Sequence, residues 1–218
     1  DAMATSEKVT GFLRDHYQSA FLTHGATAKG VDWGEKAADL VLRYDKMAAV
    51  ISASTPGPVS LLDVGCGYGG LRDHLISRNV AVEYTGIDVV PEMIASARNR
   101  HPDANFMLGD VLETNDLGEH DYVVCNGILT QKLDIPAAEM DAFASLLIRR
   151  MFSLCRIGIA FNVMTTKVNY FANNLYYRNP AELFAWCLTE FTRHIRIDHA
   201  YPLYEYTMYL YRTPTDRT

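Results

Sequence analysis

Apolar residues recur at helical spacing in the N-terminal part of the chain, before any strand pattern begins. Residues 6–22 place their apolar side chains on one side of a helix, at Val9, Phe12, Leu13, Tyr17, Ala20 and Phe21. A second helix is predicted over residues 35–52, and the breaker sequence Thr-Pro-Gly-Pro at 55–58 follows it. We therefore expect residues 1–54 to form a helical cap, within the same domain as residues 55–218.

From residue 59 onward, short apolar runs alternate with amphipathic segments. The apolar runs predict strands over residues 59–63, 84–88, 105–110, 120–126 and 158–162. The amphipathic segments predict helices over residues 69–77, from 91 onward, over 136–154 and over 181–191. Two last strands, 193–200 and 206–212, flank Pro202 as a hairpin. This alternation predicts an α/β fold, in which a parallel sheet carries helices on both faces.

A glycine-rich turn joins the first predicted strand to its helix. Its sequence is Asp63-Val64-Gly65-Cys66-Gly67-Tyr68-Gly69. Glycines at such a turn let the backbone approach a ligand that a side chain would keep away. The alternating glycines do not fit the Gly-x-Gly-x-x-Gly pattern of a dinucleotide site, and the Lys-Ser/Thr pair of a phosphate-binding loop is missing. The turn therefore predicts close contact with a ligand other than a polyphosphate.

This turn resembles the first motif of the class I S-adenosylmethionine-dependent methyltransferases. Three further blocks follow in that family's order, at residues 84–88, 105–111 and 120–127, and each ends a predicted strand in a polar residue. The resemblance implies a Rossmann-like, doubly wound sheet of seven mostly parallel strands, of which the last is antiparallel. It also implies S-adenosylmethionine as the cofactor, with S-adenosylhomocysteine as the product, and N-terminal helices that lie over the substrate.

Two acids at predicted strand ends are the main candidates for holding an adenosyl group. Asp88 follows the glycine turn by about twenty residues, the usual distance for an acid that accepts ribose hydroxyls. The alternative is that Asp88 caps the helix at Pro91, and that Asp110 merely forms a turn. The resemblance gives Asp110 the adenine amino group. The cofactor-binding candidates are Asp63, Gly65, Cys66, Gly67, Asp88, Val89, Asp110, Val111 and Asn126.

The groups that would act on a substrate are less clear from the sequence. Asn126 ends the fourth strand, Asn162 ends the fifth, and Tyr176 lies in the loop that follows. A long loop in a compact domain is often functional, and aromatic rings attract a cation such as a sulfonium. The catalytic candidates are Tyr176, Asn126 and Asn162, and the substrate-facing candidates are Tyr17, Trp33, Tyr170 and Tyr177. Packing is the alternative role for the tyrosines.

The composition of the chain indicates which kinds of molecule it is expected to bind. The 218 residues carry a formal charge of −6 and no basic run, which argues against a nucleic-acid partner. No apolar stretch is long enough to span a bilayer. The four cysteines are widely spaced, which predicts buried, reduced thiols in a cytoplasmic protein and no metal site. We expect a small-molecule substrate, and a monomer or homodimer.

Three functions remain open at this point. The first is methyl transfer from S-adenosylmethionine to a small molecule. The second is cyclisation of S-adenosylmethionine itself to azetidine-2-carboxylate, with release of methylthioadenosine, because no general base is evident in the sequence. The third is a non-catalytic subunit that binds the cofactor for a partner.

Overall fold

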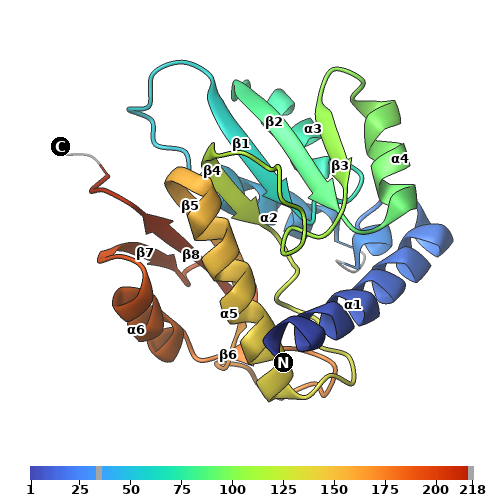
Figure 1. The fold of residues 1–218 in the computed structure, drawn as a ribbon, viewed down its shortest axis with the longest axis vertical. Helices are drawn as coiled ribbons and strands as arrows, with labels where there is room; N and C mark the ends of the chain where they lie inside the picture. Colours follow the sequence, from blue (N-terminus) through green and yellow to red (C-terminus); the bar gives the residue numbers. More distant parts are fainter. Residues whose placement is uncertain (33–35, 216–218) are drawn as a thin grey trace.

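An eight-stranded sheet with helices on both faces forms the body of the protein (Figure 1). The computed structural model describes residues 1–32 and 36–215. The strand order is β3-β2-β1-β4-β5-β8-β7, with β6 paired to β5 off this path. This arrangement confirms the predicted α/β, doubly wound fold. The strands are β1 Val59–Val64, β2 Val82–Asp88, β3 Asn105–Leu108, β4 His120–Cys125, β5 Cys155–Thr165, β6 Tyr177–Arg178, β7 His194–Asp198 and β8 Glu205–Tyr211.

The sheet is mostly parallel, and its last strand is antiparallel as predicted. β8 pairs antiparallel with β5 on one side and with β7 on the other. The predicted count of seven strands was one short, because β6 lies in the segment that we expected to be a loop. β5 begins before residue 158 and extends past residue 162 to Thr165, so its end offers backbone groups with which Tyr177 and Arg178 pair.

The helices agree with the predicted order, and their bounds differ at the ends. α1 begins at Ala2, because the Asp1 carboxylate accepts the Met3 N–H at 3.1 Å and caps the first turn. α2 is shorter than predicted, and the residues before it at 33–35 lie outside the described part of the chain. The helices are α1 Ala2–His24, α2 Ala37–Ala48, α3 Gly70–Ser77, α4 Pro91–Arg100, α5 Ala137–Leu154 and α6 Pro180–Glu190, with a 3₁₀ turn η1 Lys29–Val31.

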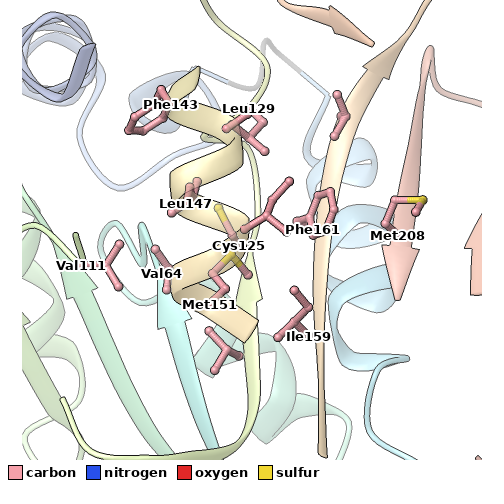
Figure 2. Packing of buried hydrophobic residues seen from close by; sticks show 14 of the residues in the cluster. Val64, Val111, Cys125, Leu129, Phe143, Leu147, Met151, Ile159, Phe161 and Met208 are labelled. Atoms are coloured by element: carbon pink, nitrogen blue, oxygen red, sulfur yellow. The ribbon is translucent and has the colours of Figure 1, made fainter. Parts of the chain in front are cut away.

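Two apolar layers hold the helices to the sheet. α5 and α6 cover one face, where Phe143, Leu147 and Met151 of α5 belong to the same buried apolar cluster as Ile159 and Phe161 of β5 (Figure 2). Residues from α2, α3 and α4 form the layer on the other face. Each fully buried side chain of this size stabilises the fold by about 1.5–3 kcal/mol. The four cysteines are free and buried, as predicted.

α1 crosses the carboxyl ends of the parallel strands, as Figure 1 shows. Polar contacts fix it at both ends of this crossing. Lys8 pairs with Glu139 of α5 at 3.0 Å, and Gln18 donates to both carboxylate oxygens of Glu92 of α4 at 3.0 Å. Ligands of open α/β sheets bind beyond these strand ends, so α1 covers the place where a site is expected. Within the described residues, no helix is both long and apolar enough to cross a membrane.

Candidate active site

The glycine turn after β1 has the backbone shape that only glycine adopts readily. Gly65 has φ +73°, and a Cβ at this position would lie 2.7 Å from Cδ1 of Ile128. The N–H groups of Gly65 and Cys66 both donate to the carbonyl oxygen of Ile87, at 2.8 and 3.1 Å. The turn is therefore anchored to the end of β2, and the missing side chain at Gly65 leaves room for the side chain of Ile128.

Asp88, the last residue of β2, faces this turn. One of its carboxylate oxygens accepts the Gly67 N–H at 2.9 Å, and the other accepts the Val90 N–H at 2.9 Å. Burial raises the pKa of this carboxyl, and the backbone donors oppose that shift. Since each ionised oxygen offers two lone pairs, one remains on each oxygen for a ligand. The capping alternative is thus compatible with ligand binding, because the same carboxylate does both.

Asp110 lies two residues beyond the end of β3 and is held from two directions. Its Oδ1 accepts the N–H of Leu112 at 2.9 Å, which is the turn contact predicted as the alternative role. Its Oδ2 accepts the hydroxyl of Thr10 on α1 at 3.1 Å. The covering helix therefore bonds directly to an acid of the site, a contact that the sequence pattern did not indicate.

Asp63 is a buried carboxyl at the base of the site. It is 2 % exposed, and its Oδ2 accepts the hydroxyl of Tyr84 at 2.5 Å. Burial raises the pKa of Asp63 to about 7, the Tyr84 hydrogen bond lowers it, and the neighbouring Asp88 raises it further. Because the pKa of Asp63 lies near neutral pH, a cation that binds beside this carboxyl would favour its ionised form.

The tip of β4 is fixed by hydrogen bonds from both sides. The Gly127 N–H donates to Oδ1 of Asn162 at 2.8 Å. The Gly127 carbonyl oxygen accepts the hydroxyls of Thr130 at 2.6 Å and of Tyr17 at 3.2 Å. Asn126 accepts a further hydrogen bond from the Asn162 amide at 3.0 Å. Asn162 thus holds two consecutive residues of the tip, and Tyr17 ties α1 to the same point.

One cavity joins these features. All nine predicted cofactor-binding residues line it, and so does Tyr17 from the predicted substrate set. Asp63, Asp88 and Asp110 give it three carboxylates, and the glycine turn gives it bare backbone. This donor set fits an adenosyl group that carries cationic sulfonium and ammonium groups, because hydroxyls, an exocyclic amine and cations all pair with carboxylates.

The remaining predicted site residues lie elsewhere. Tyr176 is 2 % exposed and its hydroxyl donates to Asp141 of α5 at 2.6 Å, away from the cavity lining. Tyr177 accepts the Ala172 N–H at 2.9 Å, and Tyr170 is 79 % exposed. These three tyrosines are not among the residues that line this cavity, so a role for them toward a substrate stays a prediction. Trp33 lies outside the described residues.

Several cavity residues escaped the sequence analysis. Tyr44 of α2 and Thr10 of α1 line the cavity; the resemblance placed their helices over the substrate, but no signal singled out these two residues. The buried Glu205, 1 % exposed, bonds to Asn162 at 2.9 Å and so lies one contact away from the β4 tip. A signal for Glu205 was available: a charged residue between Tyr204 and Tyr206, in a segment otherwise typical of a strand.

Comparison with known sequences finds similarity to proteins that are named as methyltransferases. Residues 61–148 match the family described as a methyltransferase domain. The Mycobacterium tuberculosis protein Rv1506c, which is named as a methyltransferase, is 33% identical over 156 residues, covering 69% of this chain and 92% of that protein. The dTDP-3-amino-3,6-dideoxy-alpha-D-glucopyranose N,N-dimethyltransferase of Streptomyces fradiae is 40% identical over 83 residues, which are 38% of this chain and 29% of that protein.

Solved structures share the fold across nearly the whole chain. Magnesium protoporphyrin IX methyltransferase from Synechocystis PCC 6803, crystallised with bound S-adenosylmethionine, superposes with a TM-score of 0.65 at 16% identity, covering 94% of this chain and 97% of that one. The complex of DhpI with S-adenosylhomocysteine superposes with a TM-score of 0.59 at 19% identity, covering 96% of this chain and 98% of that one. With the motif order, the strand order and the relatives in agreement, the chain belongs to the class I S-adenosylmethionine-dependent methyltransferase family.

Proposed function

We propose that this protein transfers the methyl group of S-adenosylmethionine to a small molecule. The observation that carries the proposal is the row of groups along one edge of the sheet. Asp110, Asp88, the glycine turn and Asn126 follow the carboxyl ends of β3, β2, β1 and β4, which are neighbours in that order. An adenosyl compound laid along this edge would place its base, sugar and amino-acid portion against them in turn.

Each residue then has a distinct task toward the cofactor. Asp88 accepts the two ribose hydroxyls with its remaining lone pairs, while its backbone donors keep the carboxylate oriented. Asp110 accepts the adenine amino group, and Val111, which lines the same cavity, supplies its backbone N–H to the ring. The glycine turn lets the methionine portion lie against the backbone beside Asp63.

The chain's contribution to methyl transfer is positioning and exclusion of water. The bound cofactor supplies an electrophilic methyl group on a sulfonium, and in-line displacement needs acceptor and methyl group aligned. The carboxylates of Asp63 and Asp88 favour a cationic ligand in a half-enclosed cavity, where charge interactions are stronger than in water. Asn126 lines the same cavity and follows β4, three strands away from β3, after which Asp110 lies.

A small acceptor fits the shape and charge of the molecule. α1 bridges the strand ends through its contacts with α4 and α5, which limits the space above the cavity. The formal charge of −6 disfavours a polyanionic acceptor such as a nucleic acid. Two of the partly matching relatives are named for methylation of a sugar nucleotide and of trans-aconitate, both of them small acceptors.

The helical cap belongs to this proposal. We treat residues 1–54 as part of one domain with residues 55–218, since Thr10 and Tyr17 of α1 bond to Asp110 and to the Gly127 carbonyl oxygen. These bonds connect the cap to opposite ends of the cofactor cavity. α1 is thus suited to act as a cover over the bound cofactor.

The test is direct and separates the functions that the sequence left open. Calorimetric titration should show binding of S-adenosylmethionine and S-adenosylhomocysteine at micromolar concentrations. Incubation with methyl-labelled cofactor and a panel of small amines, phenols and carboxylic acids should then give labelled acceptor together with S-adenosylhomocysteine. Azetidine-2-carboxylate formed together with methylthioadenosine from cofactor alone would contradict methyl transfer and favour cyclisation. Binding of both ligands without any of these products would favour the non-catalytic subunit. The relatives named above are methyltransferases, and this observation favours the first outcome.

A further inference from the structure

A buried ion pair lies directly behind the β4 tip. Glu205 of β8 is 1 % exposed. Its Oε1 accepts a hydrogen bond from the Nε–H of Arg43 of α2 at 2.7 Å and lies 2.7 Å from Nη2 of the same guanidinium. Its Oε2 accepts the amide Nδ2 of Asn162 at 2.9 Å and the hydroxyl of Tyr201 at 3.3 Å. This pair connects the cap helix α2, through β8 and β5, to the residues that end β4.

The charge of Glu205 determines which way the Asn162 amide points. An ionised carboxylate only accepts hydrogen bonds, so the NH₂ group of Asn162 must face it. The carbonyl oxygen of Asn162 then faces the opposite way, where it accepts the Gly127 N–H at 2.8 Å. The same NH₂ group donates to Oδ1 of Asn126 at 3.0 Å. A reversed amide would place two donors against each other at Gly127 and two acceptors against each other at Asn126.

Burial of this ion pair costs desolvation free energy, so a gain in folding stability does not explain its presence. Desolvation of a buried ion pair often cancels the attraction between its members, and apolar side chains of similar size frequently stabilise a core better. The pair therefore calls for an explanation in terms of the geometry that it imposes. The hydrogen bonds on Asn162 supply one, because they lead to two residues at the end of the cofactor cavity.

We propose that Glu205 and Asn162 are positioning residues that fix the Asn126-Gly127 tip for the amino-acid portion of the cofactor. This inference rests on the proposed function and assigns residues to it that do not line the cavity themselves. The tip follows β4. This strand lies two strands away from β2, which ends in Asp88, and three strands away from β3, after which Asp110 lies. Disturbing the tip should therefore affect the methionine portion of a ligand and leave adenosine binding intact.

The test compares S-adenosylhomocysteine with adenosine as calorimetric probes of the same protein. Glu205→Gln keeps the size of the side chain and changes one acceptor oxygen into a donor. Arg43 retains the remaining oxygen, so the new NH₂ group faces Asn162 and reverses its amide. We expect the affinity for S-adenosylhomocysteine to fall about tenfold, or about 1.4 kcal/mol. The affinity for adenosine should change less than twofold.

Two further variants make the result decisive. Asn162→Ser removes the contacts to the tip without leaving Glu205 unpaired, so it carries the test if Glu205→Gln does not fold. Asp121→Asn is the matched control, since Asp121 pairs with Arg156 at 3.0 Å at the opposite end of β4. Equal losses for both probes, or no loss for either, would overturn the positioning role. A wild-type protein that binds adenosine and S-adenosylhomocysteine equally well would overturn it too, and one that binds neither would overturn the proposed function with it.

Discussion

Replacement of Asp88 by asparagine should weaken S-adenosylhomocysteine binding about 100-fold, which corresponds to about 2.7 kcal/mol. The carboxylate holds the Gly67 N–H on one oxygen and the Val90 N–H on the other, and both bonds are 2.9 Å long. Asparagine has a single acceptor oxygen, so its NH₂ group opposes one of these two donors. Either the Gly67 N–H or the Val90 N–H loses its acceptor, and the ribose loses one of the oxygens that would accept its hydroxyls, each a charge-assisted bond.

The measurement is calorimetric titration of wild type and variant, with circular dichroism melting to confirm that both are folded. Asp103→Asn is the matched control, because it removes the same charge from a position whose side chain is 74% exposed and which pairs with Arg72. Asp103→Asn should bind like the wild type. Asp88→Asn binding within threefold of the wild type would show that this carboxylate does not hold the ribose.

Replacement of Asp63 by asparagine should make the ligand-free protein more stable at pH 8 while weakening cofactor binding. The pKa of Asp63 is raised from 3.8 to about 7 by burial. The folded state therefore holds the proton more tightly than the unfolded chain does. Stability is lost as the pH rises from about 4 through about 7, by about 4 kcal/mol at most for a shift of this size. Asparagine carries no such cost and still accepts the Tyr84 hydroxyl.

Thermal melting between pH 4 and 8 checks this expectation. The variant should melt several degrees above the wild type at pH 8, with the difference shrinking toward pH 4. Asp121→Asn serves again for comparison, because hydrogen bonds and Arg156 lower the pKa of Asp121 and its loss should not stabilise the protein. A variant that melts below the wild type at pH 8 would contradict a buried, proton-holding carboxyl at position 63.

Binding of the cofactor should reverse the effect of this substitution. The ammonium group placed beside Asp63 favours the ionised carboxylate, so binding near pH 6 should release a proton and should tighten between pH 6 and 8. The Asp63→Asn variant should bind at least tenfold more weakly at pH 8 and lose this part of the pH dependence. Titration in buffers of different ionisation enthalpy measures the proton release. Equal proton release by wild type and variant would place the ammonium elsewhere.

The sequence predicted which strand-end residues line the cavity, because local signals determine where these residues lie. A glycine turn after a buried strand has few alternative structures, and polar residues that end parallel strands meet at one edge of the sheet. Asp63, Asp88, Asp110 and Asn126 accordingly line one cavity. The same reasoning placed the antiparallel hairpin at the C-terminal end, since Pro202 separates two strand-like segments.

The surroundings of Tyr176 and the contacts of α1 were less predictable, because they depend on how distant segments pack. The loop argument for Tyr176 failed to anticipate β6, which draws this segment onto β5 and turns the Tyr176 hydroxyl toward Asp141. The contact between Thr10 and Asp110 joins residues that are a hundred positions apart. Periodicity identifies the apolar face of a helix, and it carries no information about which strand end the helix will cover.

A crystal structure of the protein grown with S-adenosylhomocysteine tests the central claim most directly. The account predicts both ribose hydroxyls within hydrogen-bond distance of the Asp88 carboxylate, the adenine amino group at Asp110, and the homocysteine portion along Gly65 and Gly67. A nucleoside bound elsewhere, or bound in this cavity with the sugar and base turned away from those two carboxylates, would contradict it.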